Sequence, residues 1–413
     1  MRTGSHKNMN IWIFNQYAHA HDLPGGTRHF DLALQLKSFG HDVTIFSAGF
    51  HYTLLNEMQE YNAEGYRLEN KEGINFLWVK TVKYSSNNYR RLLNILSYSW
   101  RLNRIISKLN LTEPDIIIGS TVHPFAGLLG SKLAKNFSVP FIFEIRDLWP
   151  QTFIDMGIWK KNDLKSIVFR MIEKITVRSS DSIIVLSPMT KIYLRDVYNY
   201  DIDKVLLLPN GVTDKFFKDP EQALDGPIKI YYVGGIDLVH GLDFLIDLAR
   251  ELCDQKIEFH LYGDGKQRLA LEDKVLNHGL SNVFFHGSIS KTSVPNVLNK
   301  ANLLFVSTSN VLYGSENKLY EYMAAGKPIV VAGSGSHNNP IETINCGVTL
   351  NRNDVKEASK ALTDFIYKNS SNFEILGKNG QNYVTKNRKL EVLGKNLEIF
   401  LANTKKLERN KLK

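Results

Sequence analysis

Short apolar runs alternate with longer helical patterns along this 413-residue chain, and this alternation limits its fold more than any other feature. A first apolar run, Ile11–Phe14, is followed by a glycine-containing turn, a helical pattern from about 29 to 39, and a second run, Val43–Phe46. Because buried strands joined by helices pair in parallel, this opening predicts a β-α-β unit. Further strands of the same sheet are expected at Phe76–Val79, Ile116–Ile118, Phe141–Ile145 and Ser182–Leu186.

The same pattern starts again after the turn at Pro209–Gly211 and a polar linker that ends at Pro227. The second series of strands is expected at Ile228–Val233, Glu258–Tyr262, Val283–His286, Leu303–Ser307 and Pro328–Val331. Two such series predict an α/β protein of two Rossmann-like domains that face each other across a cleft, where open sheets bind ligands. We place the domains at 9–214 and 215–385, with a C-terminal helix and basic tail at 386–413 that returns toward the first domain.

Composition narrows the class of protein. The chain has two cysteines, Cys253 and Cys346, and neither belongs to a CxxC pair. This usage fits a reducing compartment and argues against a disulfide framework or a thiolate zinc site. No apolar run approaches the roughly 20 residues of a membrane-spanning helix, and no His, Asp or Cys cluster has metal-ligand spacing. We therefore predict a cytoplasmic protein, soluble or peripheral on the inner face of the plasma membrane, without a bound metal.

The net charge of +9 is concentrated in part of the first half. The stretch 73–112 has no acidic residue, and within it 89–108 combines helical periodicity with basic and aromatic side chains. Such a helix suits an anionic membrane surface; the alternative is a helix packed on the sheet with a solvated basic face. No nucleic-acid recognition motif accompanies the charge. The basic residues of the stretch are Lys80, Lys83, Arg90, Arg91, Arg101, Arg104 and Lys108.

The most informative segment is a glycine-containing loop that enters a helix near Lys318. The free N–H groups and positive dipole end of a helix start stabilise a diphosphate, and Lys318 adds a formal charge there. Glu321, one turn later, can accept two hydrogen bonds from a ribose. The alternative is an i, i+3 ion pair on a solvated helix. The loop and first turn supply further candidate ligands for such a nucleotide: Gly314, Ser315, Glu316 and Asn317.

Three other loops follow expected strands and supply candidate binding residues. Glycine lets a backbone approach a ligand closely, and charges at the end of a buried strand are costly unless they are paired or functional. Arg28 either contacts phosphate or covers the domain surface, and Arg146 either lines the cleft with its neighbours or pairs with one of them to order the loop. His51 and His123, which also follow strands, are further cleft candidates. The residues of these loops are Gly25, Gly26, Thr27 and Arg28; Gly234 and Gly235; Gly263, Asp264 and Gly265; and Glu144, Arg146 and Asp147.

The stretch from Lys318 to Val330 resembles the C-terminal signature of the family 4 glycosyltransferases, retaining enzymes of the GT-B architecture. Glu321 matches the glutamate that holds the donor ribose in that family. The resemblance also implies that 262–265 receives the nucleotide base, and that 25–28 lies near the donor phosphates and the acceptor. It covers nearly the whole chain from Met9 to about Leu401. The first domain would then bind the acceptor and the second the nucleotide sugar.

This sequence departs from the family pattern at three positions. The family's first glutamate falls at Tyr313, and the arginine and lysine that grip the donor diphosphate fall at Gly235 and His240. These departures put the usual phosphate clamp in doubt, and Lys318 is our candidate replacement. His240 is either a ligand or a surface turn residue.

The string Glu144–Gln151, with Gly40–Phe46, Phe50–Tyr52 and Val122–Phe125, resembles one branch of the family. That branch is typified by the N-acetyl-L-fucosamine transferases of O-antigen and capsule synthesis. The resemblance implies transfer of an N-acetylated deoxyhexosamine from a UDP-sugar to a polyprenyl-diphosphate-linked glycan, with retention and without a cofactor or metal. Two alternatives stay open: a UDP-N-acetylhexosamine 2-epimerase, and a non-catalytic protein that binds nucleotide sugars.

Overall fold

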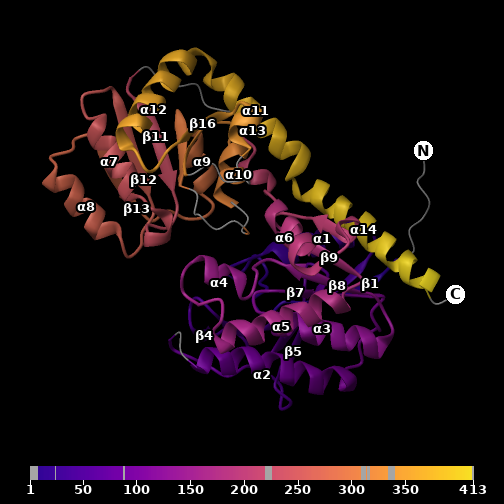
Figure 1. The fold of residues 1–413 in the computed structure, drawn as a ribbon. Coiled ribbons are helices and arrows are strands. Elements are labelled where there is room, and N and C mark those ends of the chain that lie inside the picture. The colour runs from indigo at the N-terminus through magenta and orange to yellow at the C-terminus, as the bar shows by residue number, and fades with distance from the viewer. Residues whose placement is uncertain are drawn as a thin grey trace, which may run out of the picture. The chain divides into compact units, whose positions relative to one another are not determined.

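The computed structural model describes residues 8–23, 25–86, 89–218, 226–307, 313, 317–333 and 340–411, and these residues form two compact units. Unit 1 takes its described residues from Met1–Asn210, Tyr313–Ser315 and Leu390–Lys413, and unit 2 from Gly211–Leu312 and Glu316–Lys389. Each unit is built on its own sheet with helices on both faces (Figure 1).

Unit 1 contains an 8-stranded sheet that is parallel except at one edge. In spatial order its strands are β10 (Val205–Leu207), β9 (Ser182–Val185), β8 (Phe141–Ile145), β7 (Ile116–Ser120), β1 (Asn10–Phe14), β2 (Asp42–Ala48), β6 (Ile74–Val79) and β5 (Tyr66–Lys71). The strands expected from apolar runs are present. The antiparallel edge strand β5 was not foreseen, because its side chains are mostly exposed or half-buried and it has no apolar run. A short hairpin, β3 (Phe50–His51) and β4 (Asn56–Glu57), follows β2.

Two apolar layers cover the faces of this sheet. One lies beneath α2, α3 and α6 and contains Trp12, Phe46, Tyr98, Leu133 and Phe143. The other lies beneath α1 and α14 and contains Ile13, Phe30, Leu36 and Trp78. The helices of unit 1 are α1 (Arg28–Ser38), α2 (Tyr89–Ile105), α3 (Pro124–Phe137), α4 (Gln151–Asp155), α5 (Leu164–Ser179), α6 (Pro188–Tyr198) and α14 (Leu390–Lys411).

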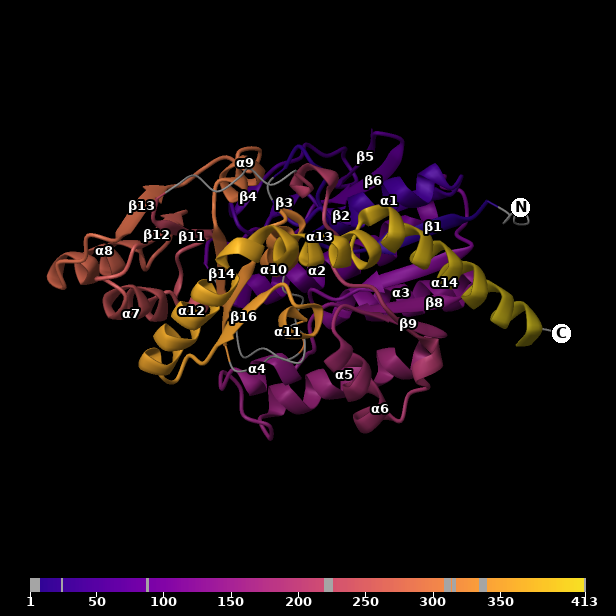
Figure 2. The same ribbon diagram turned by 90° about the horizontal axis from the view of Figure 1, so that it is seen from above.

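The C-terminal helix α14 packs beside α1 and completes the second layer of unit 1 (Figure 2). Its apolar side chains Leu393, Leu397 and Leu401 are buried there. Thr404 Oγ1 lies 3.0 Å from Ser182 Oγ at the start of β9, and Lys405 pairs with Asp115 just before β7. The last segment of the chain therefore stabilises the first sheet.

Unit 2 contains a 6-stranded, wholly parallel sheet. Its order is β13 (Val283–Gly287), β12 (Ile257–Tyr262), β11 (Ile228–Val233), β14 (Leu303–Ser307), β15 (Ile329–Ala332) and β16 (Gly347–Leu350). One apolar layer lies beneath α7, α8 and α12, and the other beneath α9, α10, α11 and α13. These helices are α7 (Asp243–Glu251), α8 (Arg268–Asn277), α9 (Val294–Asn299), α10 (Asn317–Ala324), α11 (Ile341–Ile344), α12 (Val355–Asn369) and α13 (Phe373–Asn387).

Close backbone packing inside unit 2 gives a test of this arrangement. A Cβ at Gly377 of α13 would lie 1.9 Å from the carbonyl oxygen of Gly326, so Gly377→Ala must push the helix away from the turn that follows α10. We expect this substitution to lower the free energy of unfolding by about 1–3 kcal/mol, measured by urea denaturation. Gly380→Ala on the same helix is the matched control, since its nearest contact would be 3.4 Å. It should be neutral or stabilising, and equal losses for both variants would contradict the packing.

Candidate functional site

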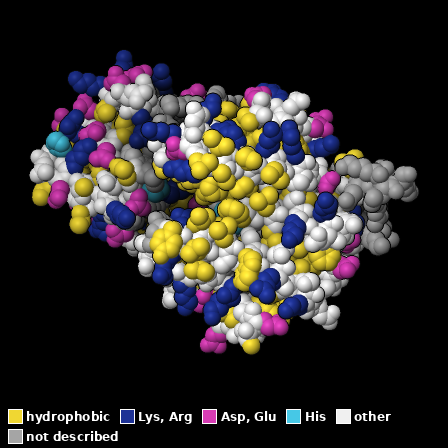
Figure 3. Space-filling model, turned by 60° about the horizontal axis from the view of Figure 1, so that its bottom comes forward, with side chains coloured by type: hydrophobic (Ala, Val, Ile, Leu, Met, Phe, Trp, Pro, Cys, Tyr) yellow, Lys and Arg dark blue, Asp and Glu magenta, His cyan; other side chains and the backbone are white. Residues whose placement is uncertain are grey.

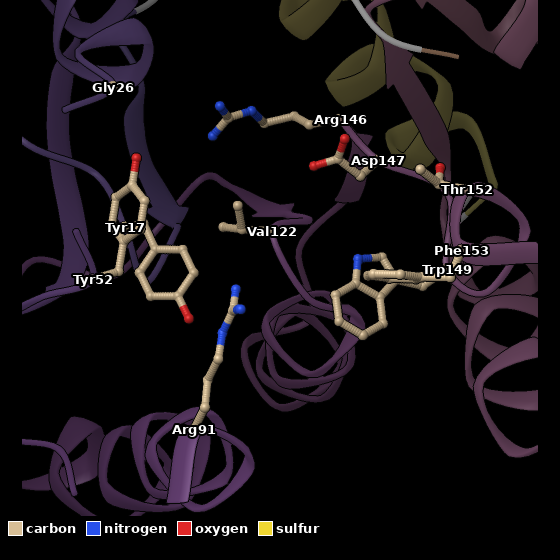
Figure 4. Close-up of a pocket in the computed structure, with 10 residues that line it drawn as sticks. All are labelled: Tyr17, Gly26, Tyr52, Arg91, Val122, Arg146, Asp147, Trp149, Thr152 and Phe153. Atoms are coloured by element: carbon tan, nitrogen blue, oxygen red, sulfur yellow. The ribbon is translucent and has the colours of Figure 1, made fainter. Parts of the chain in front are cut away.

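A pocket opens at the carboxyl edge of the unit 1 sheet. The strand order reverses between β1 and β7, and open parallel sheets bind ligands at such a switch point. Tyr17 follows β1, Val122 follows β7, and Arg146 and Asp147 follow β8. The cavity volume is about 290 Å³. Topology therefore brings side chains that are far apart in the sequence to one hollow (Figure 4).

The walls of this pocket combine aromatic rings with charge. Arg91 points into it from α2, and Arg146 reaches in from the loop after β8 (Figure 4). Aromatic rings of this kind stack on sugar faces or hydrocarbon, and guanidinium groups bind phosphate or carboxylate. The pocket is suited to an amphiphilic or anionic ligand. Its lining residues are Tyr17, Gly26, Tyr52, Arg91, Val122, Arg146, Asp147, Trp149, Thr152 and Phe153.

Glu144 lies in the interior of unit 1, not on the pocket wall. Its Oε1 accepts hydrogen bonds from Arg28 at 3.0 and 2.8 Å, and its Oε2 accepts from His29 and Ser120 at 2.6 Å each. Burial alone would raise the pKa of Glu144, but Arg28, His29 and Arg146 hold it well below its usual value. Asn15 Nδ2 lies 2.8 Å from His29 Nδ1, which fits a neutral imidazole whose Nε2–H faces the carboxylate. Glu144 is thus a supporting group.

Arg28 also has partners inside unit 1, which differ from both the phosphate contact and the surface position considered from the sequence. Besides Glu144, its guanidinium donates to the carbonyls of Leu208 and Pro209 at 2.7 and 2.8 Å, and to Asn210 Oδ1 at 3.2 Å. The side chain is buried. A guanidinium with these bonds holds the end of β10 against the start of α1.

The glycine loop before α1 has a part that faces the pocket. Gly25 has φ +130°, and a Cβ there would lie 2.7 Å from the ring of His19, so only glycine fits. Gly26 lines the pocket, and the Thr27 hydroxyl donates to Asp31 at 2.7 Å. This loop supplies backbone, not charge, to the site.

Arg146 and Asp147, which the sequence marked as cleft candidates, both line the pocket of unit 1. Thr121 Oγ1 accepts from both backbone N–H groups, at 2.8 and 3.4 Å. The Arg146 Nε is buried and has no hydrogen-bond partner among the described residues. Partial removal from water by the neighbouring side chains raises the pKa of the Asp147 carboxyl, and the positive charge of Arg146 opposes this rise.

The two histidines considered from the sequence are buried in unit 1. His123 Nε2 lies 2.6 Å from Gln16 Oε1, and burial lowers its pKa to about 3. His51 stacks on His19 with ring centroids 4.6 Å apart. These contacts make both of them packing residues.

In unit 2 the glycine loops after β11 and β12 pack on each other. Gly263 has φ +144°, and a Cβ there would lie 1.8 Å from the carbonyl oxygen of Gly234. The Ile236 N–H donates to the Asp264 carbonyl at 2.9 Å, and a Cβ at Gly265 would lie 2.4 Å from the Ile236 oxygen. The glycines are therefore required for two backbones to meet at this edge of the sheet.

Lys318 in the first turn of α10 reaches the end of β11. Its Nζ donates to the Tyr232 hydroxyl at 2.8 Å and lies 4.9 Å from the centre of that ring. The Tyr232 hydroxyl in turn donates to the Gly235 carbonyl at 2.6 Å. A Cβ at Gly234 would lie 2.4 Å from Lys318 Nζ. A fixed cation thus stands at the switch point between β11 and β14.

Glu321 is half-buried on the same helix. Burial raises its pKa, and the neighbouring cations Lys215, Lys318 and Lys291 oppose this shift. The Tyr322 hydroxyl donates to the Val233 carbonyl at 2.8 Å and accepts from the Val233 N–H at 2.7 Å. These two bonds tie α10 to β11 and set the position of both Lys318 and Glu321.

The two positions that depart from the family's diphosphate clamp are neighbours. A Cβ at Gly235 would lie 3.3 Å from the His240 ring, and burial together with Lys318 lowers the pKa of His240. His240 is accordingly neutral at pH 7.

Gly314, Ser315 and Glu316 lie outside the described residues. Asn317 begins α10, and the Tyr313 ring lies 5.7 Å from that of Tyr193 in unit 1.

Sequence reasoning missed several residues of the pocket and of the donor loops. Arg91 was assigned only to a basic helix, and Tyr17, Tyr52, Thr152, Phe153 and Tyr232 were not singled out. Tyr17 and Tyr232 could have been found by their positions at the ends of expected strands. Whether the other residues reach the pocket depends on where α2, α4 and the β3–β4 hairpin pack.

One face of unit 1 exposes apolar side chains on α2 and α5, which both pack on α3 (Figure 3). Trp100 is 57% exposed and Leu164 is 78% exposed. The acidic residue of α5, Glu173, is buried, and α2 has none. Among the described residues no helix is both long and apolar enough to span a membrane. We call this surface the apolar face; it comprises Leu92, Leu93, Leu96, Trp100, Leu164, Ile167, Val168, Met171 and Ile175.

Comparisons with known proteins agree with the two-unit description. Residues 25–216 match the family described as "Glycosyltransferase Family 4", and residues 214–383 match "Glycosyl transferases group 1". The chain is 24% identical over 314 residues to an uncharacterized glycosyltransferase, MJ1178, of Methanocaldococcus jannaschii, covering 73% of this chain and 83% of that protein. It is 24% identical over 284 residues to the putative colanic acid biosynthesis glycosyl transferase WcaI of Escherichia coli, covering 64% and 68%.

Solved structures show the same fold at low identity. HepE of Anabaena in complex with UDP aligns with a TM-score of 0.70 at 15% identity, covering 96% of this chain and all of that one. Sucrose-phosphate synthase of Thermosynechococcus elongatus aligns with a TM-score of 0.69 at 18% identity, covering 98% and 99%.

Two Rossmann-like units of this kind, together with the two family matches, define a glycosyltransferase of the GT-B architecture. Since the two family matches together span residues 25–383, the chain belongs to the family 4 glycosyltransferases.

Behind the pocket, Glu173 of α5 gives a test by pH. It accepts hydrogen bonds from Tyr193 at 3.0 Å and from Tyr198, and burial raises its pKa from 4.5 to about 7. The folded state therefore binds more protons than the unfolded state between these values, so stability falls as pH rises through this window. In Glu173→Gln this fall should disappear, a difference of up to about 3 kcal/mol, measured by urea denaturation at pH 4.5, 6, 7 and 8. Exposed Glu374→Gln is the control; an unchanged slope in Glu173→Gln would contradict the titration.

Proposed function

We propose that this chain transfers a sugar, an N-acetylated deoxyhexosamine such as N-acetyl-L-fucosamine, from a UDP-sugar to a lipid-linked glycan with retention of configuration. The observation that carries the proposal is the fixed position of Lys318 at the carboxyl end of β11, with Glu321 one turn away. In this proposal unit 2 holds the donor and the pocket of unit 1 holds the acceptor. The branch resemblance supports the sugar, and HepE, a protein of the same fold solved with UDP, supports the uridine nucleotide.

In the proposed reaction the bond between the anomeric carbon and the β-phosphate oxygen breaks, and a bond to an acceptor hydroxyl oxygen forms. The acceptor proton goes to an oxygen of the departing UDP, so the protein needs no strong base. Lys318 Nζ stabilises the charge that develops on the diphosphate. Glu321 accepts from the ribose hydroxyls, and the loops at 234–235 and 263–265 approach the nucleotide with their backbones. Neither a metal ion nor a cofactor takes part in this scheme.

The function is tested by incubating the full chain with a panel of UDP-sugars and a polyprenyl-diphosphate-linked glycan, in the presence of EDTA, and following UDP release. We expect acceptor-dependent release for one donor and retained configuration in the product by proton NMR. Release that needs a divalent ion would refute the metal-free scheme. A UDP-sugar isomerised without acceptor would point to the epimerase, and binding without turnover to the non-catalytic protein.

Substitutions of Lys318 and Glu321 should change different kinetic constants. Lys318→Ala should lower kcat by about 100-fold, the scale of losing one donor to a developing anion. Glu321→Gln should mainly raise the KM for the UDP-sugar. Lys300→Ala, an exposed lysine of the same unit, is the charge-matched control and should leave both constants unchanged. If Lys318→Ala kept full kcat, the lysine would not be the phosphate clamp.

We also propose that the apolar face attaches the enzyme to an anionic membrane, where a lipid-linked acceptor resides. Exposed apolar side chains with cations around them and without exposed acids on α2 and α5 match such a surface. Trp100→Ser with Leu164→Ser should reduce sedimentation with vesicles of phosphatidylglycerol and phosphatidylethanolamine at least fivefold. Leu269→Ser with Leu276→Ser removes equally exposed side chains from α8 of unit 2 and should have no effect. Equal binding by both double variants would refute the attachment.

A further inference from the structure

The unit 1 pocket contains two guanidinium groups, those of Arg91 and Arg146. Arg91 comes from α2 and Arg146 from the loop after β8, and both point into the same hollow (Figure 4). The Arg146 Nε is buried without a hydrogen-bond partner among the described residues. Because an unsatisfied buried donor is costly, a ligand acceptor at this position would be stabilising.

The charges around the pocket leave it cationic. Glu144, a buried carboxylate on β8, accepts its hydrogen bonds from Arg28, His29 and Ser120, and Arg146 interacts with it only through its charge. The residues that line the pocket include one acidic side chain, Asp147, and two arginines, so their net charge is positive. Arg91 also lies near Tyr17, where its charge opposes the rise that burial causes in the pKa of that phenol.

The position of Arg91 on α2 indicates what kind of anion the pocket takes. The next two residues, Leu92 and Leu93, belong to the apolar face and are exposed. A ligand whose phosphate met Arg91 would place a hydrocarbon chain against the same turn of helix. Guanidinium groups bind phosphate through paired N–H donors, and two of them on separate elements suit a diphosphate better than a single carboxylate.

We infer that Arg91 and Arg146 form the subsite for the phosphate groups of an amphiphilic acceptor, with its hydrocarbon directed onto α2. This inference rests on the proposed function, since it names the residues that hold the acceptor of that reaction. It assigns to Arg146 a direct contact with the acceptor and to Arg91 a role separate from the general charge of its helix.

The test uses farnesyl diphosphate as the probe and the full chain with its donor site saturated by UDP, so that the probe cannot occupy that site. Binding is measured by titration calorimetry. Arg91→Gln and Arg146→Gln should each weaken binding at least tenfold, or about 1.4 kcal/mol. Arg90→Gln, adjacent on the same helix and outside the pocket lining, should change it less than twofold. The affinity for UDP, measured first, should be the same in all variants and reports that each is folded.

Two further binding experiments show whether the pocket recognises the diphosphate, the hydrocarbon or both. Farnesol should bind far more weakly than farnesyl diphosphate, and inorganic pyrophosphate should compete poorly because it lacks the hydrocarbon. The inference is overturned if Arg91→Gln and Arg146→Gln bind like the parent chain, if Arg90→Gln loses as much as Arg91→Gln, or if pyrophosphate competes equally well. The proposed function is judged separately by UDP release, so a chain that binds the probe through both arginines but transfers no sugar would refute only the function.

Discussion

The buried carboxylate of Glu144 joins four segments of unit 1. It lies on β8, accepts from Ser120 at the end of β7 and from His29 and Arg28 at the start of α1, and Arg28 extends the network to the carbonyls after β10. A buried charge is tolerated only with such partners, and removing one from a pair of this kind typically costs about 3–5 kcal/mol. The pocket is formed from the loops that these bonds hold together, since Gly26 precedes α1 and Arg146 follows Glu144 by two residues.

The strands of unit 1 could be predicted from the sequence, but the network around Glu144 could not. Most strands are marked by apolar runs, because a strand that is buried on both faces needs apolar side chains throughout. The strand β5 is mostly exposed or half-buried and has no such run. The partners of Glu144 could not be predicted either, because Arg28 and Glu144 are 116 residues apart and no local pattern connects them. From the sequence, Arg28 beside its glycine turn was expected either to contact phosphate or to cover the domain surface, and an internal pair was not foreseen. The packing of α1 beside β8 is what brings Arg28 to the carboxylate of Glu144.

Local patterns predict which side chains lie close together where one helix contains all of them. Lys318 and Glu321 share the first turns of α10, so their common position follows from helical spacing alone. Arg91 is the opposite case, because the periodicity of α2 marks it as one of several basic residues. Its entry into the pocket depends on how α2 packs against α3 and beside the loop after β1. Sequence therefore predicts the shared position of Lys318 and Glu321 more readily than the place of Arg91 in the pocket.

The departures from the family pattern in unit 2 have a common physical basis. The arginine and lysine of the usual diphosphate clamp are replaced by Gly235 and His240, and His240 is neutral because burial and the charge of Lys318 lower its pKa. The cation at this edge is Lys318, which comes from α10 and reaches Tyr232 through space that a side chain at Gly234 would fill. Restoring a bulky cation at 235 would crowd His240, whose ring lies 3.3 Å from a Cβ at that position. Gly235, His240 and Lys318 thus lie together at this edge of the sheet, where Lys318 supplies the positive charge that the glycine and the neutral histidine lack.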